Sequence, residues 1–223
     1  MQRYSFCNVL NDSKESFRMR IYSLPTSMIH ANTYVIAPDE SNDAVIIDPT
    51  RNVQLKSLLE QHNLHPIAIL LTHGHFDHTS ALPTFTEDFP IPVYLHSGDA
   101  RMLEDGQCNA LHYLFPDKPF EPIKEYHPVN EGQLLSLGGL EFKVLSTPGH
   151  SNGSVCYLIE DCLFSGDTLF KGGYGRFDLW GGNVQKLQSS LSRILLMNSS
   201  IKVYPGHGEM TTIAQEYQRY NSN

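Results

Sequence analysis

The chain has 223 residues, of which 40% are hydrophobic, and it carries a formal net charge of −8. This composition indicates a globular protein with a substantial core and excludes a disordered chain. The acidic balance gives no support for a nucleic-acid partner, no apolar run is long enough for a membrane span, and the first residues lack the apolar core of a signal peptide. We therefore expect a cytoplasmic protein with neither a membrane nor a nucleic-acid partner; composition leaves its oligomeric state open.

The four cysteines are scattered and form no Cys-x-x-Cys pair. This spacing favours free thiols in a reducing compartment. Cys156 and Cys162 flank a predicted hairpin, so a contact between these two is the alternative.

The first predicted strands cover residues 19–24, 33–37 and 44–48. Each is rich in β-forming residues and is separated from the next by Pro, Asn or Asp, which predicts consecutive antiparallel strands. Asp48-Pro49 ends the third strand. Asp48 is interpreted either as a carboxylate that orients a metal ligand or as a plain turn residue.

A helical stripe over residues 53–59 precedes a short apolar run, 67–71, which predicts a buried strand. The next stretch, 72–79, places four possible metal ligands between His73 and His78. Imidazole nitrogens suit zinc, iron and similar ions, and a carboxylate adds charge and a harder oxygen ligand. The alternation of His73 and His75 lets both reach one ion, whereas Asp77 and His78 begin the next turn and point elsewhere. A helix follows near residues 82–89, with Asp77 or Thr79 as its cap.

The remaining chain predicts a strand at 92–95, a weak helix at 97–103 and an irregular, proline-rich segment at 105–130. That segment is interpreted either as substrate-facing or as a surface crossover. Two hairpins follow, at 134–145 and 155–165. Residues 171–182 are glycine-rich without the spacing of a phosphate-binding loop. An amphipathic helix at 184–195, a strand at 202–204 and a closing helix at 210–220 complete the chain.

The sequence His73-x-His75-x-Asp77-His78 resembles the signature of the metallo-β-lactamase superfamily. Segments similar to the later ligand positions of this superfamily follow in the expected order. They are residues 147–151 around His150, 164–170 around Asp167 and 204–208 around His207. The resemblance implies a four-layer αββα sandwich, an α/β fold of two mixed sheets with helices outside. Periodicity alone predicts only two sheets covered by helices.

Within the superfamily, the chain is most similar to glyoxalase II enzymes, the hydroxyacylglutathione hydrolases. The similarity rests on residues 31–34, 46–49, 166–170, 175–177 and 205–208. Full-length members carry a C-terminal helical domain that helps to hold glutathione, but only a short stretch follows His207 here. We therefore expect one domain over residues 1–223, similar to the short subgroup, with a polar extension at 1–17.

The resemblance implies two divalent metal ions, zinc above all, with iron or manganese as alternatives. By this analogy His73, His75 and His150 hold one ion, Asp77, His78 and His207 hold the second, and Asp167 bridges them. A metal-bound hydroxide would attack the carbonyl of a small-molecule thioester. Asp77 would also orient the nucleophile and take part in proton transfer. Arg176 and Tyr174 are the candidate substrate contacts, since an arginine after a glycine-rich turn can hold a carboxylate.

Two other enzyme readings and one non-enzyme reading share the same motif. The persulfide dioxygenases are a sister group that uses one iron held by residues matching His73, His150 and Asp167. A lactonase of the same superfamily is also open, and a metal-dependent binding protein without turnover is the third. All seven ligands are present, which disfavours the binding protein, and residues 168–170 with Phe177 favour the hydrolase.

Overall fold

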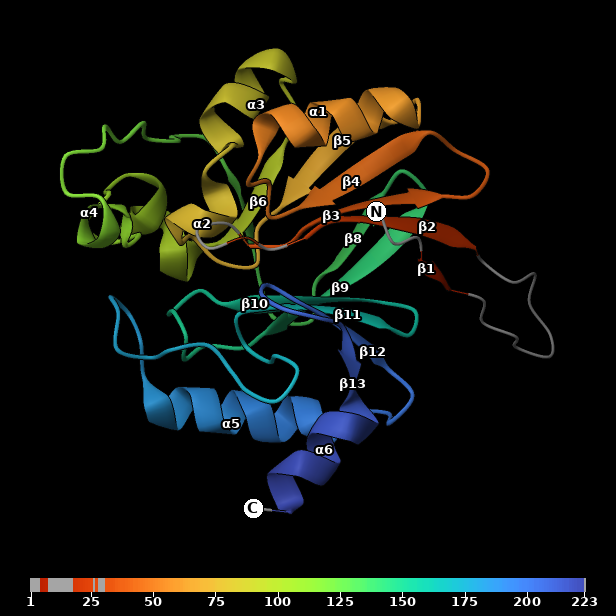
Figure 1. Cartoon of the computed structure of the whole chain (residues 1–223), viewed down its shortest axis with the longest axis vertical. Coiled ribbons are helices and arrows are strands. Elements are labelled where there is room, and N and C mark those ends of the chain that lie inside the picture. Colours follow the sequence, from red (N-terminus) through yellow and green to blue (C-terminus); the bar gives the residue numbers. More distant parts are fainter. Residues whose placement is uncertain (1–4, 8–17, 26, 28–30, 223) are drawn as a thin grey trace.

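Two mixed β-sheets pack face to face in the computed structural model, with helices on both outer faces (Figure 1). The structure describes residues 5–7, 18–25, 27 and 31–222. The predicted extension at 1–17 lies outside these residues, apart from its strand at Ser5–Cys7. That residues 1–223 form one domain stays a prediction. The αββα architecture implied by the resemblance is confirmed.

The first sheet contains strands β1 to β7 in chain order, and α1 and α3 cover its outer face (Figure 1). Strands β1 to β4 are antiparallel, and β4 to β7 are parallel. The elements of this half are β1 (Ser5–Cys7), β2 (Met19–Leu24), β3 (Thr33–Pro38), β4 (Asp43–Ile47), α1 (Asn52–Gln61), β5 (His65–Leu70), α2 (Phe76–Thr79), α3 (Leu82–Asp88), β6 (Val93–His96), the 3-10 helix η1 (Ser97–Leu103), α4 (Leu111–Leu114) and β7 (His127–Val129).

The second sheet has the order β13-β12-β11-β10-β9-β8, and α5 and α6 cover it from below in Figure 1. Its strands are antiparallel except for the parallel pair β11 and β12. The elements are β8 (Leu134–Leu137), β9 (Leu140–Ser146), β10 (Val155–Ile159), β11 (Cys162–Gly166), α5 (Val184–Leu195), β12 (Lys202–Pro205), β13 (Thr211–Thr212) and α6 (Ile213–Asn221).

Three hydrophobic clusters separate the four layers. The central cluster lies between the sheets and includes Ile36, Phe142 and Phe164. The other two lie between each sheet and its helices. The alternation of strand side chains explains this division, because successive residues face opposite sides of a sheet. Within the described residues, no helix has the length and apolar character to cross a membrane.

Two local predictions need correction. Neither Asp77 nor Thr79 caps the helix at 82–88: a separate short helix, α2, begins after His75, and Ala81 precedes α3. The predicted helix at 210–220 begins only at Ile213, since the two residues before it form β13. Cys156 and Cys162 do not form a disulfide with each other, and they pack in different clusters, on opposite faces of the second sheet.

Candidate metal centre

The seven predicted ligands lie where strands of both sheets end. The parallel strands β4, β5 and β6 finish at one edge, followed by Asp48, the loop at 71–75 and η1 respectively. In the second sheet β9, β11 and β12 run in one direction, because β10 is antiparallel to β9 and β11 and β12 is parallel to β11. Their ends carry His150, Asp167 and His207. Val155 N donates to the carbonyl of Thr72 at 2.8 Å, which joins the two sheets at this edge.

Asp48 contacts both Thr72, at the start of the loop that carries His73 and His75, and the imidazole of His78. Its backbone is left-handed, with φ at 52°. Its carboxylate accepts from Thr72 N at 2.8 Å and from Thr72 Oγ1 at 2.7 Å, and it lies 2.8 Å from His78 Nδ1. The Nδ1–H of His78 therefore points at Asp48, so its Nε2 faces the other donors. Of the two interpretations of Asp48, the structure shows the orienting contact.

The first group of donors is His73, His75 and His150, all buried. His150 Nε2 lies 3.1 Å from His73 Nε2 and 2.8 Å from His75 Nδ1. The carbonyl of Arg176 accepts from His150 Nδ1 at 2.6 Å, which leaves the Nε2 lone pair facing the group. Burial and the neighbouring imidazoles lower the pKa of His73 well below its usual value and that of His75 to about 3. These imidazoles are therefore neutral at pH 7, the form that binds metals.

The second group is Asp77, His78 and His207. Asp77 Oδ2 lies 3.1 Å from His207 Nε2 and 3.9 Å from His78 Nε2. Burial alone would lower the pKa of His78, but the carboxylates of Asp167, Asp48 and Asp77 outweigh it and raise this pKa well above 6.5. Burial raises the pKa of Asp77, and the nearby histidines His78 and His207 outweigh this, so that its pKa is lowered.

Asp167 lies between the two groups. Its Oδ1 lies 3.2 Å from His78 Nε2, and its Oδ2 lies 3.5 Å from His150 Nε2 and 3.6 Å from His207 Nε2. Despite its burial, the cation on His78 and the other nearby histidines hold its pKa well below the usual range. Glycine at position 206 makes room for it, since a Cβ there would lie 2.3 Å from Asp167 Oδ1.

The donors fit divalent metal ions. Among the described residues, the buried His75 Nε2 has no hydrogen-bond partner, and His78 Nε2 and Asp167 Oδ1 form an ion pair at 3.2 Å without hydrogen-bond geometry. Leaving buried polar atoms unpaired costs about 1–3 kcal/mol each. In each group, the imidazole nitrogens and carboxylate oxygens lie within 4.8 Å of one another. Donors of these types suit zinc or iron. The residues present can therefore hold a divalent metal ion.

Asp99 joins the loops that carry the two halves of the first donor group. It is fully buried in η1, and its Oδ2 accepts from Ser151 Oγ at 2.6 Å and from Gly74 N at 3.2 Å. Its Oδ1 accepts from Gly153 N at 2.7 Å. Burial raises the pKa of Asp99. Sequence reasoning misses this residue, because a lone carboxylate in a short helix has no spacing pattern.

The glycine-rich segment borders the centre. Gly175 N donates to the carbonyl of Asp167 at 2.9 Å, and a Cβ at position 175 would lie 2.2 Å from that oxygen. The Arg176 side chain is half-exposed, donates to both carboxylate oxygens of Asp178 at 2.7 and 2.8 Å, and lies over the Tyr113 ring at 5.7 Å. Tyr174 lies farther along, with its ring 6.3 Å from that of Tyr220. Among the described contacts, the backbone carbonyl of Arg176 thus meets the candidate donor His150, whereas the ring of Tyr174 faces Tyr220.

The model of the family described as the metallo-beta-lactamase superfamily matches residues 28–207. The chain belongs to this superfamily. The matched residues include all seven donors.

Several superfamily members are similar over most of the chain. A hydroxyacylglutathione hydrolase, GloC, of Haemophilus influenzae is 33% identical over 89% of this chain and 95% of its own. A probable metallo-hydrolase, YqgX, of Bacillus subtilis is 36% identical over 89% and 94%.

Several solved structures are similar in fold. The BLEG-1 B3 metallo-β-lactamase is 40% identical with a TM-score of 0.83, over 89% of this chain and 96% of its own. TTHA1623 in a di-iron-bound form is 35% identical with a TM-score of 0.79, over 89% and 98%. ETHE1 of Myxococcus xanthus is 29% identical with a TM-score of 0.72, over 89% and 82%.

Proposed function

We propose that the protein is a dinuclear metal-dependent thioesterase of the glyoxalase II type, which hydrolyses small S-acylglutathione-like thioesters. The observation that carries this proposal is the position of Asp167, whose carboxylate oxygens lie within 3.6 Å of His78, His150 and His207. A carboxylate that approaches donors of both groups is suited to bridge two cations. His73, His75 and His150 would hold one ion, and Asp77, His78 and His207 the other.

When bound, such ions lower the pKa of a coordinated water toward about 7 and polarise a substrate carbonyl. Residues of the chain orient the donors and supply a proton acceptor. Arg176 O fixes the orientation of His150, and Asp48 fixes that of His78. Asp77 is half-buried beside His207, and its lowered pKa keeps it ionised at neutral pH. Its carboxylate is therefore in a state to accept a proton from the nucleophilic water.

The thiol leaving group explains why this set of residues is sufficient. A thiolate is a good leaving group, so its departure requires little protonation and no separate strong general acid. Asp77 is a proton acceptor among the donors. The free thiol Cys156 is buried on the outer face of the second sheet, and burial raises its pKa to about 11. This pKa disfavours thiolate formation at neutral pH.

Arg176 is our proposed contact for a substrate carboxylate, such as those of glutathione. Its backbone carbonyl contacts His150, and its guanidinium pairs with Asp178 and lies over the Tyr113 ring. Asp178 occupies the guanidinium in a bidentate pair, so a substrate carboxylate would compete with that exposed side chain. Tyr174, 46% exposed on the same segment, is proposed as a second contact. Zinc is the proposed metal; the di-iron form of TTHA1623 keeps iron as the main alternative.

A persulfide dioxygenase is the second candidate, and one observation favours it. His73, His150 and Asp167 lie close enough to hold a single iron, with His150 Nε2 3.1 Å from His73 and 3.5 Å from Asp167. The similarity to ETHE1 fits that reading, whereas the similarity to GloC fits the thioesterase.

An assay with three substrates separates the candidates. The metal-loaded protein is given S-lactoylglutathione, glutathione persulfide with oxygen, and a simple lactone. We expect thioester cleavage without oxygen uptake, and we expect Asp167→Ala to abolish it. Oxygen uptake on the persulfide without thioester cleavage would replace our proposal with the dioxygenase, and turnover of the lactone alone would replace it with a lactonase.

A further inference from the structure

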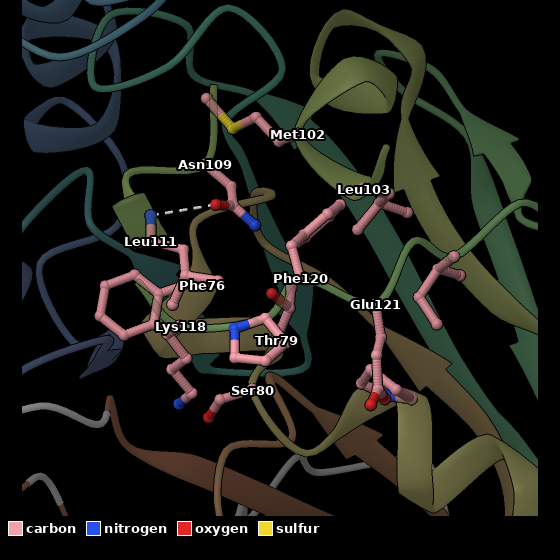
Figure 2. Close-up of a pocket in the computed structure, with 13 residues that line it drawn as sticks. Phe76, Thr79, Ser80, Met102, Leu103, Asn109, Leu111, Lys118, Phe120 and Glu121 are labelled. Carbon is pink, nitrogen blue, oxygen red and sulfur yellow. Dashed lines mark hydrogen bonds between the residues drawn. The ribbon is translucent and has the colours of Figure 1, made fainter. Parts of the chain in front are cut away.

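A pocket of about 220 Å³ lies next to α2, and none of the seven donors lines it. Phe76 and Thr79 of α2 line this pocket, whereas Asp77 and His78 of the same short helix belong to the metal centre. Its other walls come from α3, η1 and the irregular segment at 109–123. Figure 2 shows how these side chains surround the space.

Asn109 is the polar residue that is built into this pocket. Only 2% of it is exposed, and its Oδ1 accepts from Leu111 N at 3.0 Å. Its backbone carbonyl accepts from Phe76 N at 3.1 Å. Its Nδ2 makes no hydrogen bond to any residue that the structure describes, and it points into the pocket in Figure 2. The side chain is almost completely buried, but this donor faces the open space of the pocket, where a hydrogen-bond acceptor on a ligand can pair with it.

The remaining lining shows what kind of molecule fits. Most of it is apolar, from Phe76, Met102, Leu103 and Leu111 among others. The ionisable lining residues are Lys118 and Glu121, which are exposed and opposite in charge. Because none of the described residues at the inner wall is charged, a buried charge on the ligand would find no charged partner among them. The occupant is therefore uncharged where it is buried.

The size limits the occupant further. An engineered apolar cavity of about 150 Å³ in another protein binds benzene, and drug-sized ligands need about 300–1,000 Å³. A pocket between these limits takes a compact body somewhat larger than one benzene ring, or the end of a longer molecule.

We propose that this pocket is a binding site for a small uncharged carbonyl compound, whose apolar body fills the pocket and whose carbonyl oxygen accepts from Asn109 Nδ2. The site does not depend on the metal chemistry. The bound molecule would contact α2 and α4, the two short helices beside the centre. Leu111 of α4 lines the pocket, and Tyr113, two residues farther on, lies against Arg176.

Two matched probes test the proposal: acetophenone and ethylbenzene, which differ in the carbonyl group alone among their functional groups. Binding is followed by amide NMR shifts of the full-length, zinc-loaded, 15N-labelled protein. We expect acetophenone to bind about fivefold more tightly than ethylbenzene, as one neutral hydrogen bond predicts. The shifts should centre on residues 76–80, 102–111 and 118–123.

Asn109→Asp is the matched variant. It keeps an oxygen for Leu111 N but replaces the free donor with an acceptor, so the preference for acetophenone should disappear while ethylbenzene binding stays. The comparison of the two probes on the unmodified protein stands even where this variant does not fold. Equal affinity for both probes, no binding, shifts outside the pocket, or an unchanged preference in Asn109→Asp would each overturn the proposal. Equal affinity is also the result expected if Asn109 serves only to hold a water molecule.

Discussion

His78 shows how one contact controls the state of a ligand. Its Nδ1 lies 2.8 Å from Asp48, and the surrounding carboxylates raise its pKa well above 6.5. In the metal-free protein this imidazole is therefore protonated at pH 7. Its stabilising ion pairs are fully present below pH 6.5, the unfolded value, and are lost as the pH rises through the raised folded pKa.

Asp48→Asn tests this account through proton release. A metal ion that binds Nε2 of His78 must displace its proton. The variant removes one carboxylate and lowers the pKa of His78, so it should release fewer protons on zinc binding near pH 7.5. Zinc titration calorimetry in two buffers of different ionisation enthalpy measures this number. Removal of such an outer partner also typically weakens metal binding about 10–100-fold. Unchanged proton release in the variant would show that Asp48 does not control His78.

Arg176 and Asp178 form a matched pair for the substrate contact. Arg176→Ala removes the guanidinium but keeps the carbonyl that contacts His150. We expect its KM for S-lactoylglutathione to rise by about tenfold, the order of one charge-assisted hydrogen bond, with kcat and metal content little changed. Asp178→Asn removes the competitor, so its KM should fall. A drop in kcat without a change in KM in Arg176→Ala would exclude Arg176 as a carboxylate contact.

At the scale of elements, η1 connects two loops that follow strands of different sheets. Its Asp99 receives hydrogen bonds from Gly74, between His73 and His75, and from Ser151 and Gly153, next to His150. The distance between the parts of the first donor group therefore depends on a carboxylate that contacts none of them directly.

Asp99→Ala leaves three buried donors without their acceptor. We expect the free energy of unfolding of the metal-free protein to fall by at least about 3 kcal/mol, from a cost of about 1–3 kcal/mol for each of the three unpaired buried groups. Zinc affinity should fall at the first donor group as well. Ser151→Ala, which removes one of the three bonds, is the control and should show a smaller loss of both. Denaturant unfolding and zinc titration measure the two effects, and an unchanged zinc affinity in Asp99→Ala would contradict the role of Asp99.

Some helices and strands can be predicted from sequence patterns alone. The apolar run at 67–71 and the stripe at 184–195 correspond to β5 and α5, because burial of one face leaves a clear period in the sequence. The predicted helix cap at Asp77 or Thr79 was wrong, because both residues lie inside the separate short helix α2 and Ala81 precedes α3. The irregular segment at 105–130 gave no usable pattern, and it contains α4 and one wall of the pocket.

At the scale of the whole molecule, the fold brings together seven donors that are spread from His73 to His207 along the chain. The residue types and the local spacing of the first four were visible in the sequence, and the resemblance supplied the other three. The contacts of Asp99 and the position of Asn109 Nδ2 in the pocket were not predictable, because each depends on elements that are distant in sequence. The division of the donors into two metal positions remains our proposal.

Zinc titration of the metal-free protein, with S-lactoylglutathione hydrolysis measured at each step, tests the central claim most directly. We predict that turnover reaches its maximum only after two zinc ions per chain are bound. We also predict that Asp167→Ala, which lacks the carboxylate between the two groups, stays inactive at any zinc concentration. Full turnover with one ion per chain, or no thioester cleavage with two, would contradict the dinuclear thioesterase.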